Sequence, residues 1–292
     1  MTGARSWMFV PGNKPRYLAK AAASAADAVL LDLEDGVLPD EKANARDALA
    51  AVLAEPAFRP RRFVRVNAVG TPWHEDDLAA AVRPGLAGVC VPKVDSPDVV
   101  AHVAERLGAL EDRAGLPPGR TRIVAAIESA RGLLAAPAIA TGDRRVLGLM
   151  FGAEDFALDI GLGTHRVEEA RELLFARSGI VVAAAAGRVL SIDGVFPDLD
   201  DEPLFAADVA QARRLGFDAK STFNPRQLEL INAAFSPQPD EIEYARRVVD
   251  AFAAARRRGE ASVAVGGQLV DLPIVARAKG ILEAASTATA SG

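Results

Sequence analysis

Residues 28–37 read AVLLDLEDGV, a short apolar run that ends in two carboxylates and a glycine. Seven similar runs recur about every 30 residues, and nearly all end on a charged or carboxylate-bearing residue. They are RSWMFVPGN (5–13), RRFVRVN (61–67), GVCVPK (88–93), RIVAAIES (122–129), VLGLMFGAED (146–155), LSIDGV (190–195) and FDAKSTFN (217–224). Ala-rich helical stretches separate them. Eight β-type segments that alternate with helices predict an α/β fold, a (β/α)8 TIM barrel.

In such a barrel the carboxyl ends of the strands meet on one face, and that face carries the chemistry. We therefore expect the polar residues at the strand ends to converge there. They are Glu34, Asp35, Arg65, Asn67, Lys93, Glu128, Asp155 and Lys220. A ring of acids and bases of this kind indicates an enzyme that binds a divalent metal and a carboxylate substrate.

The bulk composition limits the class of protein. A chain of 292 residues suits one barrel of about 250 residues with an extension, so we expect a catalytic barrel over residues 1–234 and a C-terminal helical extension over residues 235–292. The net charge of −5 argues against a nucleic-acid surface. No apolar stretch approaches the ~20 residues of a membrane-spanning helix. The single cysteine, Cys90, lies in an apolar run, which predicts core packing and a reducing cytoplasm.

Glu128 and Asp155 form the strongest candidate pair. They lie 27 residues apart, at the ends of two adjacent predicted strands. Two carboxylates so placed can ligate one hard cation and leave positions for water and substrate, which is typical of Mg²⁺. Either carboxylate alone could equally cap a helix or pair with a basic neighbour. Their joint position after apolar strands favours the metal.

Arg65 and Asn67 lie two apart on one predicted strand and should share a face. An arginine in a barrel mouth is costly unless it meets an anion, and a bidentate contact with a carboxylate substrate would supply one. An ion pair with Glu34 or Asp35 is the alternative, and the two could coexist. At most one of Glu34 and Asp35 should reach the pocket. Orienting metal-bound water and capping a helix are equally open roles for them.

Basic residues cluster early in the chain. Lys14, Arg16 and Lys20 surround the first predicted helix, and such a cluster favours a phosphate-bearing group, although basic residues on a helix surface are common. Lys93 and Lys220 add positive charge to the rim. A Schiff-base lysine is conceivable at either position, but the paired carboxylates favour a metal-dependent route.

Other cofactor motifs are missing from the sequence. It contains no Gly-rich P-loop and no Rossmann fingerprint, which disfavours nucleotide triphosphate or NAD chemistry. The three histidines, His74, His102 and His165, show no metal-ligand spacing.

Seven segments together resemble the citrate lyase β-subunit-like family of the HpcH/HpaI aldolase group, which also contains malyl-CoA and citramalyl-CoA lyases. They are RSWMFVPGN, LLDLEDGV, FVRVNAVGT, VPKV, AAIESARG, FGAEDF and GGQLVDLP, and they run from residue 5 to about residue 275. The resemblance implies a TIM barrel that assembles as a homotrimer or a multiple of it, such as a hexamer. It also implies Mg²⁺ bound by Glu128 and Asp155.

The resemblance further implies roles in substrate binding and catalysis. Arg65 would contact the keto acid and the developing enolate, with Glu34 and Asp35 as further catalytic residues. Asp271 would act as acid/base and arrive from a neighbouring subunit; without the resemblance it is an ordinary helix cap. The backbone around Ala153, Glu154 and Asp155 would hold the substrate's carboxylate. The CoA-binding residues would be Lys14, Arg16, Lys20 and Lys93.

One position departs from the family pattern. Many relatives have I-H-P-x-Q after the eighth strand, whereas this chain has Asn224 in place of the histidine. An amide cannot carry a proton at neutral pH, so we expect no acid/base role there, and a substrate different from that of characterised members is an open alternative.

The predicted activity is reversible carbon–carbon cleavage of a carboxylated 3-hydroxyacyl thioester, such as malyl-, citramalyl- or citryl-CoA, into an acetyl thioester and a 2-keto acid. Its partners would be CoA thioesters and keto acids, without nucleic acid or membrane. Three enzymatic alternatives remain open at this stage: a malyl-CoA thioesterase or malate-synthase-like enzyme, a CoA-independent pyruvate aldolase, and a citrate lyase β subunit that acts on an acyl-carrier protein. A purely structural or binding role is the fourth.

Overall fold

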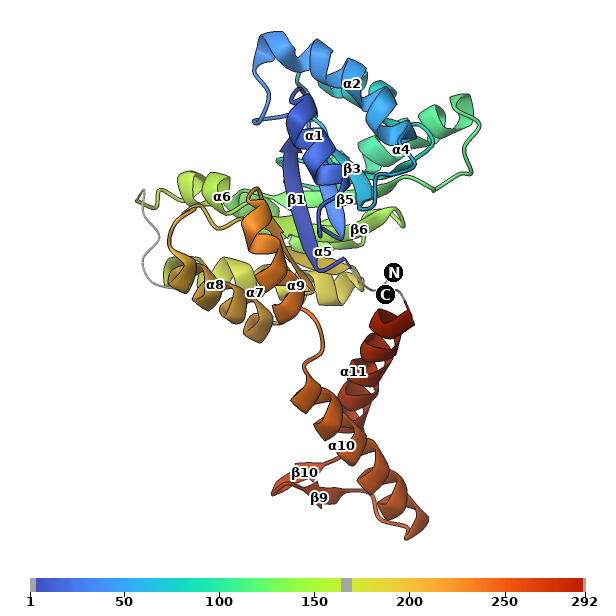
Figure 1. Ribbon diagram of the computed structural model, residues 1–292, viewed down its shortest axis with the longest axis vertical. Coiled ribbons are helices and arrows are strands. Elements are labelled where there is room, and N and C mark those ends of the chain that lie inside the picture. Colours follow the sequence, from blue (N-terminus) through green and yellow to red (C-terminus); the bar gives the residue numbers. More distant parts are fainter. Residues whose placement is uncertain (1–3, 164–169, 291–292) are drawn as a thin grey trace. The chain divides into compact units, whose positions relative to one another are not determined.

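The computed structural model describes residues 4–163 and 170–290, with side chains up to residue 286. Its sheet is a closed barrel of eight strands in chain order, each parallel to the next, and the eighth pairs with the first. Figure 1 shows strands of the barrel with the helices around them. The strands are β1 (Ser6–Pro11), β2 (Ala28–Asp32), β3 (Arg61–Arg65), β4 (Leu86–Val91), β5 (Arg122–Ile127), β6 (Val146–Phe151), β7 (Leu190–Asp193) and β8 (Ala219–Thr222). The predicted (β/α)8 barrel is confirmed.

Helices connect the strands and pack outside the barrel. They are α1 (Pro15–Ala22), α2 (Lys42–Ala54), α3 (His74–Ala81), α4 (Pro97–Arg113), α5 (Ala130–Ala140), α6 (Ala153–Asp159), α7 (Leu174–Gly187), α8 (Glu202–Leu215) and α9 (Leu228–Ala234). In the described part of the chain, three 3₁₀ turns lead into α2, α7 and α9: η1 (Pro39–Glu41), η2 (Arg171–Leu173) and η3 (Pro225–Gln227). Among the described residues, none of the helices combines the length and apolarity that crossing a membrane requires.

The barrel interior is a packed apolar core. Trp7 of β1 and Phe63 of β3 belong to it, with ring centroids 4.6 Å apart. Cys90 joins this core and is buried and unpaired. Because a filled interior leaves no channel, only the residues at the carboxyl ends of the strands are available for chemistry. We call this end the mouth.

Lys220 does not reach the mouth, which corrects the expectation from sequence. Its neighbour Ala219 faces the barrel core, and side chains alternate along a strand, so Lys220 faces the surrounding helices. There it is fully buried, with Nζ 2.7 Å from Asp193 and 2.6 Å from Asp208 of α8. Arg177 of α7 binds the same two carboxylates. This ionic cluster joins β7 and β8 to their helices.

A second buried ion pair joins α4 to the start of β6. Glu111 is completely buried, and its oxygens accept from both terminal nitrogens of Arg145 at 2.8–2.9 Å. They also accept from the backbone N–H groups of Gly119 and Thr121, at 2.8 and 2.6 Å. Burial by itself would raise the pKa of Glu111, but these hydrogen bonds outweigh it and lower the pKa to about 2. The ionised carboxylate therefore stabilises the fold.

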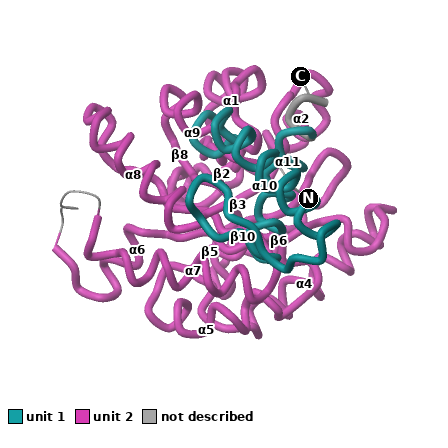
Figure 2. The backbone as a smooth tube through the Cα atoms, turned by 90° about the horizontal axis from the view of Figure 1, so that it is seen from below, with its two compact units in different colours: residues 1–3, 233–292 teal, residues 4–232 magenta. Residues whose placement is uncertain are grey.

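The chain divides into two compact units, one from Ala4 to Asn232 and the other from Ala233 onward (Figure 2). The second unit contains α10 (Pro239–Arg257), the antiparallel hairpin of β9 (Val263–Val265) and β10 (Gln268–Val270), and α11 (Leu272–Ala290). Its own small core contains Val248 and Phe252 of α10, Val270 of β10 and Val275 of α11. We propose that it serves as the C-terminal extension that the sequence predicted.

The Glu111–Arg145 pair predicts a defined acid sensitivity. A carboxyl whose pKa is lowered by folding stabilises the protein above its unfolded pKa, near 4.5, and this stability disappears as the pH falls through about 2. We expect the wild type to lose about 3 kcal/mol of unfolding free energy across that interval from this group alone. Urea unfolding at stepped pH should show this loss in the wild type and not in Glu111→Gln.

The exposed neighbour Asp112 provides the control for this experiment. Asp112→Asn should follow the wild-type pH dependence. If Glu111→Gln followed it as well, the ionised carboxylate would not be the source of the acid sensitivity.

Candidate active site

The centre of the mouth is an arginine–carboxylate pair. Arg65, the last residue of β3, donates from Nε to Asp32 Oδ1 and from Nη2 to Asp32 Oδ2, both at 2.7 Å. Its Nη1 lies 2.9 Å from Glu34 Oε2, and the guanidinium stacks over Phe9 at 4.8 Å from the ring centroid. Within the described residues, Asp32 accepts from two of the five N–H donors of the guanidinium and Glu34 lies beside a third, so two remain for a ligand.

Asp32 is held as firmly as the arginine that it binds. Its Oδ1 accepts from the backbone N–H of Glu34 and its Oδ2 from that of Gly36, each at 2.9 Å. A Cβ on Gly36 would lie 2.4 Å from Asp32 Oδ2, so only glycine allows this close approach. The turn after β2 therefore fixes the carboxylate, and the carboxylate fixes the guanidinium.

Lys93 connects two acids across the mouth. Its Nζ donates to Glu34 Oε1 at 3.0 Å, and its backbone N–H donates to Glu128 Oε2 at 2.9 Å. The backbone of Lys93 has φ +54°, a left-handed conformation that is unfavourable for a residue with a side chain. Strain of this kind persists where the surroundings enforce it and is concentrated at functional sites.

Glu128, just after β5, is 7% exposed. Burial raises its pKa to about 7, with further contributions from the charges of Glu34 and Asp155. The backbone N–H of Lys93 opposes this shift but does not cancel it. Gly152 makes room for the carboxyl, since a Cβ there would lie 2.2 Å from Cγ of Glu128. The site thus contains a buried carboxyl that is close to an even balance between its charged and neutral forms at neutral pH.

Asp155 lies in the first turn of α6, together with Ala153 and Glu154. Ala153 is buried, Asp155 is half-buried and Glu154 is exposed. Because the charge of Asp155 contributes to the raised pKa of Glu128, the two carboxylates of the predicted metal pair lie close enough to interact electrostatically. Within the described part of the chain, Asp155 receives no hydrogen bond, so its oxygens are available to a ligand.

The mouth carries more acid than base. Five carboxylates interact electrostatically there: Asp32, Glu34, Asp35, Glu128 and Asp155. Three cations face them in the described structure: Lys42, Arg65 and Lys93. With all groups ionised, the carboxylates outnumber the cations that face them. A bound divalent cation would offset this excess of negative charge.

A cavity of about 360 Å³ opens beside the mouth. Its lining includes Glu34, Lys42, Asn67, Trp73 and Lys93. Lys42 is buried against the backbone carbonyls of Leu33 and Glu34, at 2.8 and 3.0 Å, and this burial lowers its pKa. The cavity is therefore lined by the aromatic residue Trp73 and by the charged residues Glu34 and Lys93, and Glu34 also contacts Arg65.

Several predicted residues lie around this centre rather than in it. Asp35 is exposed, whereas its neighbour Glu34 is buried. Lys14, Arg16 and Lys20 are exposed at α1, where a bulky anionic ligand could reach them.

Asn67 does not share the environment of Arg65, because β3 ends at Arg65 and the strand alternation ends with it. The Asn67 amide binds Asp77 of α3 at 2.6 Å and the Leu33 carbonyl at 2.8 Å. It joins the end of β3 to the helix layer.

Two positions near the chain's end have structural contacts of their own. Asn224 is buried, and its Oδ1 accepts from the Arg226 N–H at 3.1 Å, which caps η3. Asp271 lies in the second unit, exposed, immediately before α11, with Oδ1 3.5 Å from the N of Ile274. Each residue therefore begins a helical segment, whatever further role it has.

Sequence reasoning missed two residues of this site. Asp32 is the one charged residue in an otherwise apolar strand, and that exception was the available signal for the partner of Arg65. Lys42 gave no signal, because a lysine at the start of a helix is ordinary, and only the fold shows that it is buried under the mouth.

Several known proteins are similar to this chain. A family model described as HpcH/HpaI aldolase/citrate lyase matches residues 5–225. The chain is 39% identical over 282 residues to citrate lyase subunit beta of Escherichia coli strain K12, covering 96% of this chain and 93% of that protein. It is 38% identical over 269 residues to a (3S)-malyl-CoA thioesterase of Cereibacter sphaeroides, covering 91% and 89%.

A solved structure is also similar over nearly the whole chain. It is the CitE protein of Mycobacterium tuberculosis in complex with magnesium, acetoacetate and coenzyme A. The TM-score is 0.78 at 33% sequence identity, and the match covers 97% of this chain and 98% of that one.

The raised pKa of Glu128 predicts that this residue destabilises the metal-free protein. Between about pH 4.5 and 7 the folded state holds a proton that the unfolded state has lost, so stability falls as the pH rises through that window. In chelator at pH 8, Glu128→Gln should therefore be more stable than the wild type, by up to about 3 kcal/mol. At pH 5 the difference should largely disappear.

Urea unfolding at both pH values measures this difference. Asp35→Asn, at an exposed carboxylate of the same mouth, should give a much smaller gain at pH 8. A Glu128→Gln variant no more stable than the wild type at pH 8 would contradict the assignment of a buried, strained charge.

Proposed function

Because the chain belongs to the HpcH/HpaI aldolase/citrate lyase family, we propose that it is a Mg²⁺-dependent carbon–carbon lyase. Its substrate is a carboxylated 3-hydroxyacyl thioester such as malyl-, citramalyl- or citryl-CoA, and its products are an acetyl thioester and a 2-keto acid. One observation carries the proposal: a firmly held arginine with two free N–H groups lies beside an excess of carboxylates.

The residues present fit Mg²⁺. Glu128 and Asp155 offer carboxylate oxygens, the ligands that Mg²⁺ prefers, and no side-chain cation in the described structure pairs with either of them. Gly152 leaves the space that the Glu128 carboxyl occupies. The chemistry supplied by Mg²⁺ in such a site is Lewis-acid polarisation of the substrate's hydroxyl and carboxylate oxygens.

Arg65 stabilises the charge that forms during cleavage. The substrate's hydroxyl releases its proton to solvent as the carbon–carbon bond breaks, so that its oxygen becomes the keto oxygen of the acid. The electron pair of the broken bond moves into the thioester and leaves an enolate. The two free N–H groups of Arg65 donate to the enolate oxygen in the low-dielectric mouth, where preorganised donors have their largest effect. Asp32 keeps the guanidinium from turning away, so no reorganisation is required as the charge develops.

The enolate carbon then needs a proton. We propose that Asp271 of a neighbouring subunit supplies it, and takes it back in the condensation direction. The exposed position of Asp271 before α11 is compatible with contact to a second copy. The site would then be complete only in a homo-oligomer, a trimer or a multiple of it.

The thioester group requires its own binding surface. We propose that Lys14, Arg16 and Lys20 bind the phosphates of coenzyme A, since all three are exposed cations of the first βα unit. The cavity beside the mouth is lined by Lys93 and Trp73 and can admit part of a ligand. Ala153 and Glu154 would lie against the acid's carboxylate, together with Asp155.

Two related activities have specific support. The E. coli relative is named as a citrate lyase subunit, which favours action on a thioester presented within a complex. The Cereibacter relative is named as a malyl-CoA thioesterase, which favours hydrolysis of the thioester. Arg65 and the carboxylate pair would serve both of these activities as well as the proposed lyase reaction. The reaction products therefore distinguish the three activities.

A product analysis tests the proposal. The purified chain with Mg²⁺ is given malyl-, citramalyl- and citryl-CoA, and free CoA, acetyl-CoA and keto acid are measured separately. Acetyl-CoA and keto acid in equal amounts, lost in Asp271→Ala, are the expected result. Free CoA alone would identify a thioesterase. No reaction without partner subunits would identify a component of a complex.

Arg65→Lys tests the electrostatic role. Lysine keeps the charge but cannot hold Asp32 with two parallel hydrogen bonds and still point donors at the substrate. We expect kcat to fall on the order of 10²- to 10³-fold, with a smaller change in KM. Arg62→Lys on the same strand is the matched control, because Arg62 lies at the opposite end of β3 and contacts backbone carbonyls. A loss of equal size in both variants would refute the role.

A further inference from the structure

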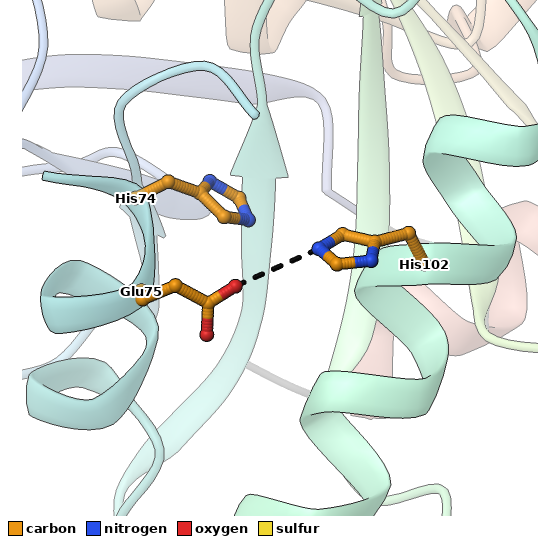
Figure 3. A group of neighbouring side chains, drawn as sticks. All are labelled: His74, Glu75 and His102. Carbon is orange, nitrogen blue, oxygen red and sulfur yellow. Dashed lines mark ion pairs between the residues drawn. The ribbon is translucent and has the colours of Figure 1, made fainter. Parts of the chain in front are cut away.

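Three side chains gather in the helix layer, apart from the active site described above. His74 and Glu75 begin α3, and His102 lies in α4 (Figure 3). One ligand atom from each, a ring nitrogen or a carboxylate oxygen, lies within 4.8 Å of the other two. The side chains point into the space between the two helices (Figure 3). The sequence showed no metal-ligand spacing here because β4 separates the two histidines.

His74 is prepared to act as a ligand. It is 2% exposed, and its Nδ1 lies 2.7 Å from the backbone carbonyl oxygen of Asn67. A carbonyl oxygen can only accept, so in the neutral ring Nδ1 carries the proton and Nε2 has a lone pair. Nε2 is buried and has no hydrogen-bond partner within the described residues. A histidine whose other nitrogen is fixed by a carbonyl is the usual arrangement in metal sites.

Glu75 is also oriented. Its Oε2 accepts from Arg106 of α4, at 2.7 Å from Nε and 2.6 Å from Nη2. Its Oε1 lies 3.6 Å from Nε2 of His102. Arg106 therefore occupies one carboxylate oxygen and leaves the other facing the two rings. The ring centroids of His74 and His102 are 6.3 Å apart.

A surface ion-pair network accounts for only part of this arrangement. Glu75, His102 and Arg106 are each substantially exposed, and exposed pairs contribute little to stability. Such a network gives no partner to the buried Nε2 of His74, and leaving a buried polar atom unpaired destabilises the folded protein. A group from outside the chain that accepts this lone pair would remove the cost.

We propose that His74, Glu75 and His102 bind a divalent transition metal, Zn²⁺ by preference, which links α3 to α4. Two imidazoles and one carboxylate are a zinc donor set, whereas Mg²⁺ prefers oxygen ligands only. Glu75 and His102 are about half exposed, so water completes the coordination. The site is separate from the proposed Mg²⁺ carboxylates and does not depend on the proposed reaction.

The first test measures Zn²⁺ affinity on the full chain. The protein is first stripped of metal with a chelator and placed in excess Mg²⁺, so that Mg²⁺ occupies the carboxylates of the mouth. It then competes with a chromogenic chelator for Zn²⁺. We expect one site in the wild type and at least tenfold weaker binding in His102→Ala and in Glu75→Gln. Glu105→Gln removes an exposed glutamate of α4, the helix that carries His102, and should bind Zn²⁺ as the wild type does. Glu128→Gln should also bind Zn²⁺ with wild-type affinity.

Two results of the affinity test would overturn the proposal. One is wild-type affinity in His102→Ala. The other is a loss of Zn²⁺ binding confined to Glu128→Gln, which would assign the metal to the mouth.

A second measurement does not depend on substitutions. In the ring ¹⁵N spectrum, Zn²⁺ should shift the Nε2 resonances of two of the three histidines together, at one equivalent. Simultaneous shifts identify His74 and His102 as ligands of one ion. A shift of His102 alone would contradict the proposal, because it would leave the buried lone pair of His74 without a partner.

Discussion

The bidentate pair between Asp32 and Arg65 is the interaction on which the rest of the mouth depends. Two backbone N–H groups hold Asp32, and Asp32 holds both sides of the guanidinium at 2.7 Å. Arg65 then faces Glu34, Glu34 accepts from Lys93, and the amide of Lys93 reaches Glu128. Each contact positions the next, from β2 to the end of β5. Without the first pair, an acid-rich mouth would have no fixed positive charge around which to assemble.

This chain of contacts does not fully balance the negative charge of the carboxylates, and burial further disfavours their ionised forms. Burial raises the pKa of Glu34 and of Glu128. A protein selected only for stability would fill such positions with neutral or apolar groups, and sites that retain buried charge generally give up stability for function. The buried clusters elsewhere differ in this respect, because Glu111 and Lys220 have full sets of partners. Incompletely compensated buried charges indicate a ligand site, whereas fully paired buried charges indicate a structural ion pair.

The order of strands and helices could be read from the sequence, because apolar runs and helical stretches alternate with a regular period. The ends of the strands could be read as well, which placed Arg65 and Glu128 at the mouth. The direction of each side chain could not. A parallel strand buried on both faces shows no polar alternation, so nothing distinguished Lys220 from its inward-facing neighbour. The proximity of His74 and His102 was hidden for another reason, since it depends on how two helices pack side by side.

Lys93 illustrates a limit of side-chain mutagenesis in this site. Its contact with Glu128 is made by a main-chain amide, held in place by a left-handed backbone. Replacement by alanine removes the ammonium group but leaves that amide where it is. A scan of alanine variants would therefore report only the bond to Glu34 and assign no importance to the other. Only a proline at this position, or an ester in place of the peptide bond, would delete the donor itself. One contact of the active site is thus made by a main-chain N–H group, which side-chain substitution does not remove.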